Sequence, residues 1–255
     1  MTYIEGFIVP VPKANKEEYR KQAADAAPIF REFGVTRHIE AWDSDVPEGK
    51  VTDFRKAVDA REDEAVVFSW FEYPDKATRD SANEKMRSDP RMEGMMKDAP
   101  FDGKRMIFGG FKPQVDEGKE TGGYIDGFIV PVPEGKVEDY NKLAQKMAGK
   151  FLEFGALRDI EAVSDDVPKG EVTDFYRAVK AEEGETVYFS FLEWPDKATR
   201  DASWEKIMKD PDMQPDHANM PFDGMRMFWG GFEPIVDSSG GGTTATADRE
   251  FASAK

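Results

Sequence analysis

Short runs of alternating apolar and polar residues divide the first 113 residues into predicted strands. The alternation is clearest over 3–11, 35–42, 51–60, 65–73 and 105–111. The first and fourth of these runs are apolar on both faces, which is typical of central strands of a sheet. The pattern therefore predicts a four- or five-stranded sheet.

Two stretches between these runs have the spacing of amphipathic helices. The first extends from Asn15 to Phe33, with Glu18 placed as in a capping box and Gly34 at the point where the helix should end. A second helix of about 14 residues should begin after Asp75, and Asp89 followed by proline marks a further helix start. The predicted order is β-α-β-β-β-α-β, the split ferredoxin-like pattern with an extra strand.

The whole pattern occurs twice. VPEGKVTDF at 46–54 returns as VPKGEVTDF at 167–175, and about 61 of 111 positions agree when 3–113 is laid over 124–234 without a gap. A period of this size is that of a small domain rather than of a solenoid repeat. We interpret the Pro- and Gly-containing motif in each copy as the turn that enters a strand hairpin.

The repeat predicts the domain organisation. We expect a first α+β domain over 1–113, a polar linker over 114–123 and a second α+β domain over 124–236. Residues 237–255 are rich in Gly, Ser, Thr and Ala, and we expect this tail to be disordered.

A sheet with helices on one face leaves an apolar face to be covered. The economical cover is the equivalent sheet of the other copy, as when two single-domain chains pair in a symmetric dimer. We therefore expect α+β architecture: two tandem ferredoxin-like domains that pair as an intrachain dimeric α+β barrel. A further homo-oligomer of whole chains stays open.

Composition restricts the function. The formal net charge is −16 and the chain has no cysteine. Such an acidic chain repels nucleic-acid phosphates and anionic lipids, so we expect neither nucleic-acid nor membrane partners. The absence of cysteine excludes thiolate chemistry and favours a cytoplasmic location, and the N-terminus lacks the pattern of a signal peptide.

Several long motifs together resemble a known family. They are YIEGFIVPVP (3–12), SDVPEGKVTDF (44–54), VVFSWFEYP (66–74), KxxxDPRM (85–92) and PFDGKRMIFGGF (100–111). On these residues both copies are similar to the YbaA-like family, domain of unknown function 1428. The resemblance implies a dimeric α+β barrel, whose relatives include cofactor-independent monooxygenases, haem-degrading enzymes and stress-related proteins, but it implies no established reaction.

The chain departs from that family in being a tandem fusion. The second copy also departs locally, where QPDHANM at 214–220 stands against EGMMKDA at 93–99. We therefore do not expect the two halves to be functionally equivalent.

Polar residues present in both copies are the candidate ligand-binding residues. A buried arginine beside a carboxylate suits an anionic or carbonyl ligand, and a carboxylate in an apolar barrel can act as a base. The alternative for each residue is an ion pair that fixes the sheet. The candidates are Tyr3, Arg37, Glu40, Asp53 and Arg105, with their equivalents Tyr124, Arg158, Glu161, Asp174 and Arg226.

Within one pair, Arg37 and Glu40 are three residues apart on a predicted strand. They should therefore point to opposite faces, with one of them in a cleft.

Histidine offers little for a mechanism common to both halves. His38 and His217 are the two histidines, and neither is repeated in the other copy. We interpret both as surface or edge residues, although a single asymmetric site remains possible. Without cysteine or a histidine pair we expect no metal site and no cofactor.

Three functions fit these observations. The first is binding of a small molecule in a cleft of the barrel, which needs only a pocket with a few polar groups. The second is a cofactor-independent enzyme, monooxygenase-like or isomerase-like. The third is an acidic protein-interaction module.

Overall fold

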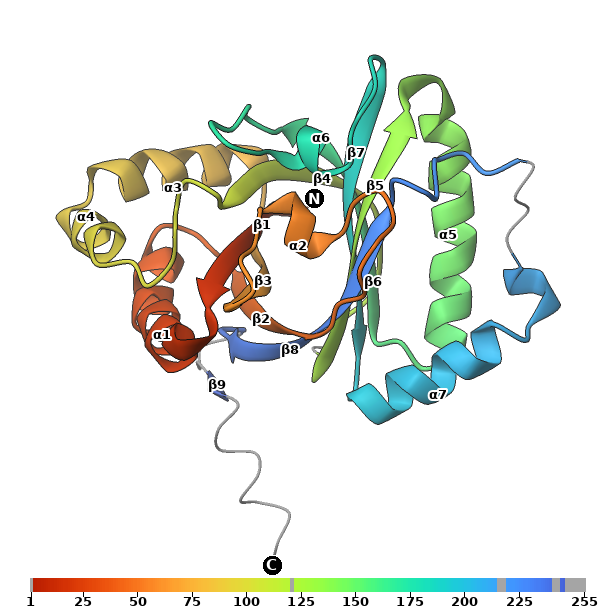
Figure 1. Ribbon diagram of the computed structural model, residues 1–255, viewed down its shortest axis with the longest axis horizontal. Helices are drawn as coiled ribbons and strands as arrows, with labels where there is room; N and C mark the ends of the chain where they lie inside the picture. Colours follow the sequence, from red (N-terminus) through yellow and green to blue (C-terminus); the bar gives the residue numbers. More distant parts are fainter. Residues whose placement is uncertain (1, 120–121, 215–218, 240–243, 246–255) are drawn as a thin grey trace, which may run out of the picture.

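A computed structural model describes residues 2–119, 122–214, 219–239 and 244–245 (Figure 1). The first half contains β1 (Tyr3–Pro12), η1 (Lys13–Asn15), α1 (Lys16–Glu32), β2 (Arg37–Asp45), α2 (Phe54–Ala57), β3 (Glu64–Tyr73), α3 (Lys76–Ser88), α4 (Pro90–Lys97) and β4 (Ile107–Gly118). The second half contains β5 (Tyr124–Pro133), η2 (Glu134–Lys136), α5 (Val137–Glu153), β6 (Arg158–Asp166), α6 (Phe175–Ala178), β7 (Glu185–Trp194), α7 (Lys197–Ile207), η3 (Pro211–Met213) and β8 (Phe228–Asp237), followed by the short β9 (Thr244–Ala245).

Eight strands close into one antiparallel barrel. The strand order is β2-β3-β1-β4 in the first half and β6-β7-β5-β8 in the second. The halves join at two seams, where β4 pairs with β6 and β2 pairs with β8. The long helices of the two halves lie on opposite sides of the barrel (Figure 1). The predicted intrachain dimeric α+β barrel is confirmed.

The barrel interior is an aromatic core shared by both halves. Phe68 and its equivalent Phe189 stack with ring centroids 4.6 Å apart and planes 5° apart. Gly6 lies under the Phe189 ring, and a Cβ there would be 2.6 Å from it. Gly127 takes the equivalent place under Phe68. Glycine at these positions is what lets the two sheets approach closely.

The repeated VPxGxVTDF motif does not enter a strand hairpin, so the prediction of a strand over 51–60 is wrong. After Asp53 the chain forms the short helix α2, because the Asp53 side chain accepts a hydrogen bond from the Lys56 amide and caps it. Phe54 is buried against Phe228 and Phe232 of the other half. The apolar residues of this segment face the end of the barrel. From the alternation in the sequence alone, the segment is predicted as a strand.

Each copy of this motif fastens to the opposite half. Thr52 donates a hydrogen bond to the carbonyl of Ala178, and Thr173 donates one to the carbonyl of Ala57. The motif occurs in both copies because each half closes one end of the barrel by binding to the opposite half.

Other local predictions had mixed outcomes. Asp75, Asp89 and Asp196 cap their helices as expected, and Gly34 and Gly155 adopt positive φ at helix ends. The capping box at Asn15 does not form, since the Asn15 amide instead donates a hydrogen bond to the Pro100 carbonyl.

The segment expected to link the halves is partly strand. β4 continues to Gly118, which pairs with Arg158, so the first part of 114–123 lies in the sheet. Most of the tail expected to be disordered lies outside the described residues. Of its described residues, Asp237 is the last residue of β8, and Thr244–Ala245 pair with the end of that strand.

Candidate functional site

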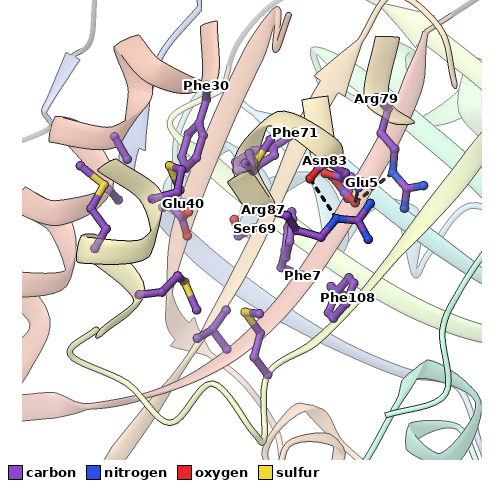
Figure 2. A pocket seen from close by; sticks show the side chains of 18 of the residues that line it. Glu5, Phe7, Phe30, Glu40, Ser69, Phe71, Arg79, Asn83, Arg87 and Phe108 are labelled. Carbon is purple, nitrogen blue, oxygen red and sulfur yellow. Dashed lines mark hydrogen bonds and ion pairs between the residues drawn. The ribbon is translucent and has the colours of Figure 1, made fainter. Parts of the chain in front are cut away.

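A cavity of about 950 Å³ lies in the first half between the outer face of the sheet and helices α1, α3 and α4 (Figure 2). Aromatic and methionine side chains form most of its wall: Phe7, Phe30, Phe71, Phe101, Phe108, Met86, Met92, Met95, Met96 and Met106. Helix α1 contributes Ala23 and Ala26, whose small side chains leave the space between helix and sheet open. The volume is typical of sites for small organic molecules.

Glu40 is the carboxylate on the wall formed by β2. Its Oε2 accepts a hydrogen bond from the Tyr19 hydroxyl at 2.7 Å, and its Oε1 lies 2.8 Å from Nε2 of His38. Two partners therefore fix the orientation of this carboxyl group, which lines the cavity (Figure 2).

His38 is fully buried, with 0% of its surface exposed, so the interpretation as a surface or edge residue is wrong. Its ring stands edge-on to Phe30 and Phe71. The strand alternation places position 38 on the outer face of the sheet, where α1 covers it. His217 lies outside the described residues.

A second polar group, formed around Glu5, stands at another part of the cavity wall. Glu5 accepts hydrogen bonds from Arg79 at 2.9 Å and Asn83 at 2.8 Å (Figure 2). Arg79 also forms an ion pair with Asp166 of the second half. The second half thus contributes to the wall of the first half's cavity, and the residues that recur in PDKATRD connect the two halves here.

The second half has a cavity at the equivalent place, of about 380 Å³. Two residues in this region are bulkier in the second half. Met147 stands where the first half has Ala26, and Trp204 stands where it has Asn83. Trp204 packs on Phe151 and donates a hydrogen bond to Asp126 at 2.8 Å. The two halves therefore carry different sites.

Glu161 lines this second cavity. It accepts hydrogen bonds from Tyr140 at 2.8 Å and from Ser190. Burial raises the pKa of Glu161 to about 7, although both hydrogen bonds act in the opposite direction. Asp159, two residues earlier, also lines the cavity, and burial together with the charges of Glu161 and Glu117 holds its pKa well above the usual range.

Arg37 and Arg158 lie outside both cavities. Arg37 forms a two-point ion pair with Glu193, at 2.6 and 2.8 Å, and Arg158 forms the matching pair with Glu72, at 2.8 and 3.2 Å. Both pairs join one half to the other. As predicted, Arg37 and Glu40 point to opposite faces of β2.

The other predicted residues hold the fold together. Arg105 pairs with Glu64 and Asp102, and Arg226 pairs with Glu185 and Asp223. Asp53 and Asp174 cap α2 and α6. Tyr3 donates a hydrogen bond to Asp165, while Lys197 and Arg200 lie over the Tyr124 ring. Of the ten candidates, Glu40 and Glu161 line the two cavities.

Sequence reasoning missed the residues that surround these two carboxylates. Tyr19, like its equivalent Tyr140, recurs in the repeat and lies on the apolar face of a predicted helix, so its pairing with the following strand could have been inferred. Arg79 recurs within PDKATRD. Asp159 gives no such signal, because its role depends on a substitution in one copy.

The described part of the chain contains no group of three or more His, Cys, Asp or Glu side chains arranged to hold a metal ion. Among the same residues no helix is long and apolar enough to cross a membrane.

Solved structures with the same architecture define the class of fold. Two proteins described as "putative monooxygenase", from Fusobacterium nucleatum and Lactobacillus acidophilus, superimpose with TM-scores of 0.59 and 0.58. Their sequence identities to this chain are 11% and 12%. Each superposition covers 96% of this chain, and it covers 97% of the first protein and 98% of the second. An anthrone oxidase-like protein has a TM-score of 0.57 at 9% identity and covers 96% of each chain. At these identities the likeness establishes the fold alone, that of a monooxygenase-like dimeric α+β barrel.

The sequence gives the family. The model of the family described as "Protein of unknown function (DUF1428)" matches residues 2–103 and again 123–224. The chain belongs to this family, as a tandem duplication. The "Uncharacterized protein YbaA" of Escherichia coli K12 is 61% identical over 117 residues, which are 46% of this chain and all of that protein.

Proposed function

We propose that the protein binds a small, largely apolar organic molecule in the cavity of its first half. The observation that carries this proposal is the cavity itself, about 950 Å³ with an aromatic and methionine wall. Methionine side chains adapt to the shape of an apolar ligand, and aromatic side chains offer it a large apolar surface. The few polar groups on the wall would give such a ligand its orientation.

Glu40 is the group that we expect to recognise the ligand. Tyr19 and His38 hold its carboxyl group at the cavity wall. A carboxylate in an apolar site binds a hydroxyl or amide donor more strongly than it would in water. We therefore expect the preferred ligand to combine an apolar body with at least one hydrogen-bond donor.

A thermal-shift screen of the full chain tests the proposal. The compounds would be neutral aromatic and aliphatic molecules, each with one hydroxyl or amide group. We expect a subset to raise the melting temperature. The variant Ala26→Met/Asn83→Trp gives the first half the two bulky residues of the second half and should lose this response. Stabilisation that persists unchanged in a folded variant would refute the proposal.

A second candidate is a cofactor-independent enzyme that transfers a proton at Glu40. The contact between Glu40 and the buried His38 favours it, because such a pair can accept a proton from a bound substrate. The first half alone has this pair, so the site would be asymmetric. Turnover of a bound compound should then be abolished by Glu40→Gln, while Glu161→Gln leaves it unchanged.

Two further predictions accompany these proposals. An acidic interaction role predicts a protein partner that is lost on removal of 237–255. We also propose a cytoplasmic location, with which a chain without cysteine is compatible.

A further inference from the structure

Asp159 and Glu161 form a pair of buried carboxyl groups in the second cavity. They are two residues apart on β6, so both point outward from the barrel toward α5. Asp159 is 2% exposed, and its Oδ2 has no hydrogen-bond partner among the described residues. A buried, unpartnered carboxyl oxygen is costly, and it lines a cavity in which a ligand could supply the missing donor.

The neighbouring elements bring little positive charge to this pair. β4 contributes the carboxylate of Glu117, and η3 contributes that of Asp212. Helix α5 contributes the hydroxyl of Tyr140 and the exposed amine of Lys146, and β7 contributes the hydroxyls of Tyr188 and Ser190. Within the described part of the chain, no ion pair joins a lysine or arginine to Asp159 or Glu161.

The first half offers an internal comparison. The position of Asp159 is occupied there by His38, whose Nε2 lies 2.8 Å from the carboxyl group of Glu40. The histidine supplies a partner to that glutamate. In the second half an aspartate takes its place, so the donor is lost and a second acidic group is gained.

The rest of the wall suits a cation with an apolar body. Phe128, Phe151, Phe222 and Tyr140 line the cavity, and aromatic faces attract organic cations. The volume of about 380 Å³ admits a single small ring or a short chain.

We propose that the cavity of the second half binds a small organic ammonium ion, whose N–H groups donate hydrogen bonds to Asp159 and Glu161. An ammonium group supplies three donors and a compact positive charge, which match two acidic groups with an unpartnered oxygen. The two halves of the chain then bind different ligands, and the site in the second half does not depend on that of the first.

Binding should release protons. Without a cation, burial and mutual repulsion keep protons on this pair near neutral pH. The ammonium ion stabilises the charged form of both carboxyl groups, so its binding displaces the protons. Affinity should therefore rise between pH 6 and pH 8, and the measured binding enthalpy should vary with the ionisation enthalpy of the buffer.

Isothermal titration of the full chain with benzylammonium chloride tests the proposal. We expect one site per chain, buffer-dependent enthalpy, and no comparable binding of benzyl alcohol in the variant Ala26→Met/Asn83→Trp, whose first cavity is filled. Asp159→Asn keeps the shape but removes the charge and should weaken binding at least tenfold. Glu138→Gln is the matched control, because it removes the same charge from the exposed surface of α5, and it should bind as tightly as the parent.

The substitution His38→Asp provides a gain-of-function test, since it gives the first half the acidic pair of the second. This variant should bind a second benzylammonium ion per chain, with an affinity equal to or lower than that of the site in the second half. The result does not depend on whether Asp159→Asn folds. The variant Ala26→Met/Asn83→Trp should leave ammonium binding unchanged, which separates this proposal from that for the first cavity.

Four results would overturn the proposal. One is the absence of benzylammonium binding. A second is equal binding of benzyl alcohol by the variant Ala26→Met/Asn83→Trp, and a third is unchanged affinity in a folded Asp159→Asn variant. The fourth is occupation of the site by Mg²⁺ or Ca²⁺ in place of the ammonium ion.

Discussion

Arg37 of the first half and Glu193 of the second form a buried ion pair through both guanidinium Nη atoms, at 2.6 and 2.8 Å. The repeat generates its counterpart, Arg158 with Glu72. A residue of one copy thus depends on a residue of the other, as in a symmetric dimer whose two chains have been fused. These four residues lie in the barrel wall, so they hold the halves in register.

Removal of one carboxylate from this arrangement should be strongly destabilising. Glu193→Gln leaves the Arg37 guanidinium buried without its principal counter-charge, although Glu72 and Asp237 remain nearby. We expect a loss of about 3 kcal/mol in the free energy of unfolding, measured by denaturant titration. Glu138→Gln is the control, because its ion pair with Lys142 lies on the exposed surface of α5 and should contribute nothing measurable. Equal effects of the two substitutions would contradict the role of the buried pair.

The second prediction concerns the close contact between Gly6 and the Phe189 ring in the barrel interior. A methyl group at Gly6 would lie 2.6 Å from the Phe189 ring, which is itself stacked on Phe68. Gly6→Ala should therefore cost about 1–3 kcal/mol, because the packed rings must shift.

Gly149→Ala is the matched control for that substitution. Gly149 lies inside α5, and a Cβ there would meet nothing within 4 Å. Alanine should stabilise the helix by about 0.5–1 kcal/mol. The account of the interior would fail if both alanine variants changed the unfolding free energy in the same direction.

The folded state should lose stability as pH rises toward 7 and beyond. Burial raises the pKa of Glu161 from 4.5 to about 7, so the native protein holds this proton more tightly than the unfolded chain does. The resulting stabilisation is fully present below pH 4.5 and disappears as pH rises through 7. Its size is about 3 kcal/mol, from about 1.4 kcal/mol per pKa unit.

Glu161→Gln should remove the part of this pH dependence that belongs to Glu161, while the buried Asp159 keeps its own part, and the variant should be more stable than the parent at pH 8. Denaturant titrations of both proteins at pH 5 and pH 8 measure the effect. Parallel pH profiles for the two proteins would show that Glu161 does not hold the proton.

The sequence predicted the barrel well because burial and repetition are both visible along a chain. Apolar residues on both faces of 3–11 required a cover, and the second copy supplied it. The segment 51–60 misled because apolar residues at the even positions Phe54, Val58 and Ala60 resemble the alternation of a strand. The residues that are buried at the barrel end, Phe54, Ala57 and Val58, instead have the i, i+3, i+4 spacing of a helix.

The sites were harder to predict than the fold. Selecting polar residues present in both copies favoured Arg37, Arg105 and their equivalents, because the ion pairs that hold a repeated fold together, between the halves or within one half, recur in both copies. The cavities owe their character to differences between the copies instead, such as His38 against Asp159 and Ala26 against Met147. Which of these differences border a cavity depends on how α1 and α5 dock, and strand or helix periodicity does not contain that information.

Native mass spectrometry of the freshly purified full chain, followed by denaturation and small-molecule analysis, tests ligand binding in the first cavity most directly. We expect a monomer with a mass excess that is lost on denaturation and is absent from the folded Ala26→Met/Asn83→Trp variant. The same mass excess in that variant, or a bare parent chain that remains bare after incubation with the compounds of the thermal-shift screen, would contradict the account.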